Sequence, residues 1–208
     1  MLNIRILFLT LCFLVISSKG YSRDITLGNF HISLPTDLIL NINPTMHISQ
    51  IAGSRKAIAG LGILLNYNEK LALGAVYRVT LNEIPLPKTT GEDRFQLREL
   101  GIHFQYTDRP RELIHFSFPF TLGVESILYS GVMPLRAGDK LNYIFLEPGV
   151  SADISIIKYV KFGIGLRYHF VPWVTSYTLQ SKDLSNISLV FSAMFGIFNF
   201  RSSSTLRF

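Results

Sequence analysis

Six ionisable residues lie in segments where polar and apolar residues alternate. Each of the six falls on the polar positions of its segment. They are Glu125, Glu147, Asp153, Lys161, Arg167 and His169. Alternate side chains of a strand point to one face, and opposite charges on neighbouring strands can pair across it. We therefore predict one polar network, with Glu147 near Arg167 and His169, and with Asp153 near Lys161.

This network has two interpretations. The first is structural: unpaired buried charges are costly, so the six groups satisfy one another inside the fold. The second is chemical, in which the same groups relay protons or clamp a ligand. The structural interpretation is favoured, because the sequence adds no further motif to the set.

Two histidines form a narrower pair. If Asp108, Arg109 and Pro110 make a three-residue turn, His103 and His115 face each other across one hairpin. Two imidazoles can begin a zinc site, but such a site needs further ligands. The neighbouring sequence offers no Cys or carboxylate for them. We therefore predict a polar histidine pair and no metal or cofactor.

Catalysis on a membrane barrel would need a nucleophile, a base and an acid that converge. Ser117 and His115 share a face, but they lie beside the predicted turn, away from the lipid that a hydrolase or acyltransferase would attack. The G-x-S-x-G motif of serine hydrolases is absent from the sequence. We predict that the chain is not an enzyme and keep a lipid-modifying activity as the lowest alternative.

The segments that carry these residues repeat with a period of two, which indicates strands rather than helices. In 160–170, for example, Phe162, Ile164 and Leu166 alternate with Gly163 and Gly165. Eight such segments occur, and an even number suits an antiparallel barrel. The predicted strands are 38–48, 57–67, 71–81, 100–106, 114–124, 146–156, 160–170 and 187–197.

The connections support an up-and-down barrel, in which short turns at one end alternate with longer loops at the other. Turns are predicted at 68–70, 108–110 and 158–159, and polar loops at 82–94, 130–140 and 171–186. The connection near 52–55 is the one exception, because it is short although it falls at the end where the other connections are long. Pro119 and Pro148 fall inside predicted strands, where we expect bulges or the barrel rim.

The chemistry of the two faces predicts a transmembrane barrel rather than a soluble one. One face is bulky and aromatic, as at Phe116, Phe118 and Phe195, whereas the other is rich in Gly, Ser, Thr and His. Lipid tolerates the first face, and a crowded polar lumen suits the second. Five aromatic residues near predicted strand ends are expected to anchor the barrel at the headgroups. They are Tyr106, Tyr129, Tyr143, Tyr159 and Trp173.

Residues 1–20 read as a cleaved signal peptide, with Arg5 before an apolar run and small residues before the cut. The barrel domain is then 21–208. The only cysteine, Cys12, lies in the signal, so the exported chain has no disulfide. Eighteen basic and 14 acidic residues remain after Arg5 and Lys19 are removed. This mild excess, without a basic run among aromatics, predicts no nucleic-acid partner.

The sequences HFSFP at 115–119 and LEPGV at 146–150, the second followed by Lys158, Gly163, Gly165, Arg167 and Tyr168, resemble small outer-membrane β-barrel proteins of Bacteroidota-type bacteria. The similarity runs from about Ala57 to the last strand. It implies an all-β, eight-stranded antiparallel transmembrane barrel in the cell envelope, and it implies no catalytic residues. Phe208 is similar to the terminal aromatic that the barrel-assembly machinery recognises.

These observations predict an outer-membrane protein with periplasmic termini, surrounded by outer-membrane lipid, whose barrel anchors extracellular loops for a surface interaction. The alternative is a porin-like transport or binding barrel with a narrow polar lumen around Glu125, Glu147, Arg167 and His169. An eight-stranded barrel leaves room inside for little more than its own side chains. The anchor is therefore favoured.

Overall fold

The computed structural model describes residues 24–27, 30–33, 38–86, 93–130, 140–174 and 179–198. The predicted signal peptide and Phe208 lie outside these residues. The described residues form strands and one short helix, α2 (Ser181–Leu184). No helix in the described ranges is long and apolar enough to cross a membrane.

Eight antiparallel strands form the body of the molecule, and all eight predicted strands are confirmed. Their bounds are β3 (Leu38–Ile51), β4 (Ser54–Tyr67), β5 (Leu71–Thr80), β7 (Arg94–Thr107), β8 (Ile114–Ser130), β9 (Lys140–Ile157), β10 (Val160–His169) and β11 (Asn186–Phe195). Three of them, β7, β8 and β9, are several residues longer than predicted. The short strand β6 (Ile84–Pro85) adds to β7, while β1 (Asp24–Leu27) and β2 (Phe30–Ser33) pair as a separate hairpin.

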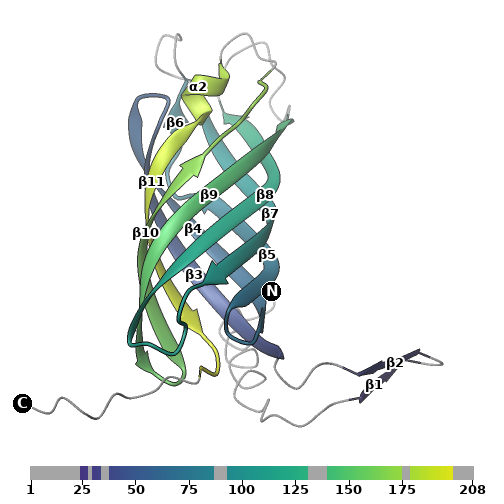
Figure 1. The fold of residues 1–208 in the computed structure, drawn as a ribbon. Helices are drawn as coiled ribbons and strands as arrows, with labels where there is room; N and C mark the ends of the chain where they lie inside the picture. The colour runs from purple at the N-terminus through teal and green to yellow at the C-terminus, as the bar shows by residue number, and fades with distance from the viewer. Residues whose placement is uncertain are drawn as a thin grey trace, which may run out of the picture.

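The sheet closes into a barrel because its first and last strands both find partners. Each long strand pairs with its neighbour in sequence, β11 pairs with β3, and β5 pairs with β7. In the closing pair His47 lies opposite Val190, and across β5 and β7 Val76 lies opposite Gly101. The strands wrap around one axis (Figure 1). The predicted eight-stranded, up-and-down antiparallel barrel is confirmed.

The barrel is apolar outside and polar inside, as the period of two predicts. Along β7, Leu100 and Ile102 are 61% and 63% exposed, whereas Glu99 and His103 are buried at 3% and 1%. The same alternation places Phe116, Phe162 and their equivalents on the outer surface of the other strands. A belt of this composition favours hydrocarbon around it, and the closed ladder leaves no strand edge unpaired there.

The two ends of the barrel differ in their connections. At the end that we call the turn end lie 68–70, 108–113 and 158–159, and at the opposite loop end lie 52–53 and the described connecting residues 81–86, 170–174 and 179–185. Figure 1 shows β6 and α2 at the loop end. The tight hairpin at 52–53 has positive φ at both Ala52 and Gly53, as a two-residue primed turn requires. The connection at 108–113 is longer than the predicted three residues.

The two prolines lie neither at bulges nor at the rim, so that expectation is wrong. Pro119 lies inside β8 and Pro148 inside β9. The β8–β9 ladder pairs Ser117 with Ser151 and resumes where Phe120 faces Pro148. Pro119 lies in this gap. Pro148 lies in a second gap, in the β9–β10 ladder, between the Arg167–Gly149 pair and the Leu146–Phe170 bridge. Each proline lacks the N–H that a ladder hydrogen bond at its position would need.

A cluster of apolar side chains fills the lumen at the loop end, and we call it the apolar cap. It combines inward-facing strand residues with residues of two loops that fold back over the opening. Its members are Ile51, Ile58, Ile84, Leu86, Phe95, Leu97, Ile127, Tyr143, Phe145, Val171, Leu179 and Leu184. The sequence analysis did not anticipate it, because the loop residues have no periodicity that marks them as buried.

Candidate functional site

The middle of the lumen holds a group of buried charges that we call the lumen charge cluster. Five strands contribute to it, from β5 to β10, and each side chain is at most 6% exposed. Its members are Arg78, Glu99, Glu125, Glu147, Arg167 and His169. Three carboxylates thus face two guanidiniums and one imidazole in a space closed to solvent.

Strand register explains why these groups meet. Arg78 lies opposite Glu99 across β5 and β7, and Glu99 lies opposite Glu125 across β7 and β8. Two carboxylates directly opposite each other repel. Cations on both sides offset this repulsion, because Arg78 reaches Glu99 from β5 and His169 reaches Glu125 from β10.

Glu147 is the acceptor that joins the cluster. Its Oε2 lies 2.6 Å from Arg78 Nη1 and 3.4 Å from His169 Nδ1, and its Oε1 lies 3.6 Å from Arg167 Nη1. Arg78 Nη1 is also 2.9 Å from Glu99 Oε2. Removing any one partner would leave another charge buried without compensation, which is the expensive case for buried ion pairs.

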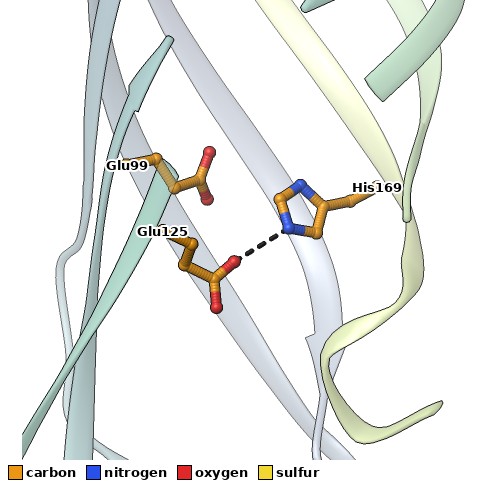
Figure 2. A group of neighbouring side chains, drawn as sticks. All are labelled: Glu99, Glu125 and His169. Carbon is orange, nitrogen blue, oxygen red and sulfur yellow. Dashed lines mark hydrogen bonds and ion pairs between the residues drawn. The ribbon is translucent and has the colours of Figure 1, made fainter. Parts of the chain in front are cut away.

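His169 bridges two carboxylates through its two ring nitrogens. Nε2 lies 2.8 Å from Glu125 Oε2, as Figure 2 shows, while Nδ1 faces Glu147. The imidazole ring of His169 stacks on the Phe145 ring at a centroid distance of 4.7 Å. Arg78 Cζ lies 5.7 Å from the centroid of the Phe145 ring. Phe145 belongs to the apolar cap, so the cap contacts the lumen charge cluster directly and helps to orient His169 and Arg78.

The structure brings four of the six predicted network residues into this cluster and leaves two outside it. Asp153 and Lys161 lie closer to the turn end. Asp153 accepts a hydrogen bond from Ser117, while Lys161 Nζ lies 4.2 Å from the centroid of the Phe198 ring. Both line a cavity of about 20 Å³, together with Arg167, and a cavity of this size holds about one water.

The sequence analysis missed Arg78 and Glu99. Arg78 occupies a polar position of the predicted strand 71–81, so the alternation itself was the signal for its inward orientation. Glu99 precedes the predicted strand 100–106 by one residue, although β7 in fact starts at Arg94. An earlier strand start would have assigned it to the lumen.

The predicted pairing of His103 with His115 is wrong. The connection at 108–113 is longer than three residues, with Asp108 donating its N–H to the Phe116 carbonyl, so Thr107 pairs with Ser117. This register places His103 opposite Thr121, whose Oγ1 lies 2.9 Å from its Nδ1. His115 instead lies opposite Asp153 of β9.

The residues that could suggest hydrolysis are not arranged for it. Ser117 donates its hydroxyl hydrogen to Asp153, whereas His115 Nδ1 donates to the backbone carbonyl of Glu112 at 3.2 Å. A serine nucleophile needs an imidazole that accepts its proton. His115 makes no such contact with Ser117 in the described structure.

The five predicted interfacial aromatics divide into two groups. Tyr106, Tyr159 and Trp173 are 39%, 45% and 78% exposed, which suits contact with headgroups. Tyr143 is instead buried in the apolar cap, and Tyr129 packs against the cap with its ring 6.3 Å from that of Phe95. For these two the prediction is wrong, because they occupy inward positions of β8 and β9 in the alternation.

Comparison with known proteins gives a likeness of fold. No protein-family model and no curated protein sequence matches this chain. Solved structures similar to it include Neisserial surface protein A, at 11% identity and a TM-score of 0.56, with 77% of this chain and 97% of that chain covered. The N-terminal β-barrel domain of Pseudomonas aeruginosa OprF is similar at 9% identity and a TM-score of 0.52, with 76% and 96% covered. The chain therefore has the fold of small outer-membrane β-barrel proteins.

The cluster predicts that Arg78 is needed for stability. We expect Arg78→Met to lower the free energy of unfolding by about 3–5 kcal/mol, because Glu99 and Glu147 both lose their cation in a buried site. The measurement is reversible urea unfolding in phospholipid vesicles, followed by fluorescence of Trp173, the only tryptophan.

Arg109→Met is the matched control. Arg109 lies in an exposed turn, 3.7 Å from Asp108 and 3.6 Å from Glu112, with 70% of its side chain exposed. Exposed pairs of this kind contribute at most about 1 kcal/mol. Equal losses in the two variants would contradict the role assigned to Arg78.

Proposed function

We propose that this chain is an outer-membrane protein whose closed barrel anchors surface loops and conducts no solute. The apolar belt supports a position in a membrane, and the fold is that of small outer-membrane barrels. Long connections gather at the loop end and turns at the other, so the loop end faces the environment and the turn end, with both termini, faces the periplasm.

The observation that carries this proposal is the filled lumen. The apolar cap occupies the loop end, the lumen charge cluster follows below it, and hydrogen-bonded polar side chains fill the turn end. The cavity beside the charge cluster has a volume of about 10 Å³. A solute would have to separate both the cap and the buried ion pairs in order to pass.

The cap also gives the loops a fixed place. Ile84 and Leu86 come from one loop, and Val171, Leu179 and Leu184 from another, and all five are buried. The hairpin at 52–53 is tied to α2, because Ala52 donates its N–H to the Asp183 carbonyl at 2.9 Å. A loop end held in this way suits a surface that contacts a partner. Trp173, at 78% exposure, is the most exposed large hydrophobic side chain among the described residues.

The remaining assignments are parts of the same proposal. The likeness to Bacteroidota-type barrels rests on the sequence segments at 115–119 and 146–150. Outer-membrane lipid is the partner of the apolar belt, and the barrel-assembly machinery is the partner of Phe208. Transport remains the alternative function, and lipid modification is the lower one. We expect no catalysis, since Ser117 has no imidazole to activate it in the described structure.

The proposed orientation predicts which end of the barrel can be labelled on living cells. Lys182 lies in α2 at the loop end and Arg111 in the connection at 108–113, and both are exposed. A membrane-impermeant maleimide added to intact cells should label Lys182→Cys and leave Arg111→Cys unlabelled. Permeabilised cells should label both variants, and the reverse pattern on intact cells would overturn the orientation.

The closed lumen predicts that the protein forms no conducting channels in planar lipid bilayers. Purified barrel should insert without step-like increases in current, because no continuous aqueous path crosses the cap and the charge cluster. An open porin inserted into the same bilayer serves as the positive control. Reproducible open-channel steps from the purified protein would favour the transport alternative and contradict the proposed anchor.

A further inference from the structure

The lumen charge cluster contains a set of donors that suits a metal ion. One carboxylate oxygen each from Glu99 and Glu125 and one ring nitrogen of His169 lie within 4.8 Å of one another, and all three residues are buried. Figure 2 shows the two carboxylates and the imidazole converging from different strands. Imidazole nitrogen and carboxylate oxygen are ligands that Zn²⁺ accepts. We propose that this cluster binds one Zn²⁺ ion between His169 Nε2, Glu99 and Glu125.

An independent observation is the presence of buried polar atoms without partners at the same place. His47 is 1% exposed and Glu125 is 1% exposed, yet His47 Nε2 and Glu125 Oε1 have no hydrogen-bond partner. His47 lines the cavity of about 10 Å³ beside the cluster, together with Glu99, Glu125 and His169. Leaving such atoms unsatisfied is unfavourable, and a metal ion would satisfy both. His47 lies beside the three converging donors and outside their group, so it could become a fourth donor only after its side chain moves towards them.

The second ring nitrogen of His169 has the partner that a metal-binding histidine needs. Nδ1 lies 3.4 Å from Glu147 Oε2, and that oxygen is held at 2.6 Å by Arg78. A carboxylate that accepts the hydrogen of one nitrogen directs the lone pair of the other towards the metal. Glu147 therefore acts as the orienting residue, and Nε2 is the nitrogen left for Zn²⁺.

The carboxylates also keep oxygens available. Glu99 Oε2 lies 2.9 Å from Arg78 Nη1 but accepts no hydrogen bond, and Glu125, which contacts His169 through Oε2, keeps Oε1 without a partner. Without metal, Nε2–H donates to Glu125. When Zn²⁺ binds, this proton leaves for solvent and the metal takes its place, so each bound ion releases one proton. With the ion bound and His169 neutral, three carboxylates face the ion and two guanidiniums, so the site carries one net positive charge.

The experiment uses the processed protein, refolded into detergent micelles after treatment with a chelator. Titration with ZnCl₂ by calorimetry should give one site per chain. Repeating the titration in buffers of different ionisation enthalpy should give about one proton released per ion. Folding is checked by the heat-dependent mobility shift that intact barrels show on gels.

Substitutions locate the site within the lumen. We expect Glu125→Gln and His47→Gln each to weaken Zn²⁺ binding about tenfold or more. His115→Gln is the matched control, since His115 is a buried lumen histidine near the turn end, opposite Asp153. It should bind Zn²⁺ as the parent does. Parent protein without a stoichiometric site, or equal affinity in Glu125→Gln and the parent, would overturn the proposal.

A spectroscopic measurement on the parent protein guards against variants that fail to fold. Co²⁺ in place of Zn²⁺ should give the intense visible bands of a four-coordinate site with nitrogen and oxygen ligands. Spectra of the weak, hydrated type would contradict the proposal without any substitution. Because conductance and surface labelling do not depend on the metal, failure here leaves the proposed anchor function standing.

Discussion

Hydrocarbon offers no partner for a backbone N–H, a backbone carbonyl or a charge, and this constraint shapes the whole molecule. Eight strands meet it by closing on themselves, so that β11 pairs with β3 and β5 with β7. The alternation of side chains then divides each strand into an apolar half that faces outward and a polar half that faces inward. The polar half has no route to water except through the lumen.

That division forces the lumen to neutralise its own charges. A barrel of this size is filled by side chains, so the charges must pair with one another. Arg78 and His169, for example, both pair with the carboxylate of Glu147. The apolar cap excludes water from the loop end of this cluster, which strengthens each pair and raises the penalty for breaking it. The proposed anchor function and the proposed metal site both rest on this packed interior.

The period of two was sufficient to predict the eight strands and the inward face of most residues, because a barrel with an apolar outside and a polar inside needs this alternation along every strand. Tyr129 and Tyr143 lay beyond the predicted strands 114–124 and 146–156, and only the longer β8 and β9 place them at inward positions. The pairing register between neighbouring strands was harder to predict from the sequence. A three-residue turn at 108–110 was assumed, and the longer connection moved His103 from His115 to Thr121.

Contacts made by loops were beyond the reach of periodicity. Leu86 and Leu179 lie in irregular connections and Ile84 in the two-residue strand β6, and only the folded chain shows that they close the lumen. Arg78 and Glu99 differ from them, because both occupy inward positions of strands and needed only correct strand bounds. The composition of the cluster was therefore predictable in principle, whereas its exact partners depended on register across five strands.

Methyl NMR of isoleucine-labelled protein in micelles tests the inside-out arrangement most directly. A paramagnetic fatty acid dissolved in the micelle should broaden the methyl signals of Ile102 and Ile164, which are 63% and 49% exposed. Signals of Ile51, Ile84 and Ile127, at 1%, 0% and 0%, should stay sharp. Equal broadening of the two sets would contradict a barrel that turns its apolar face to lipid and its polar face inward.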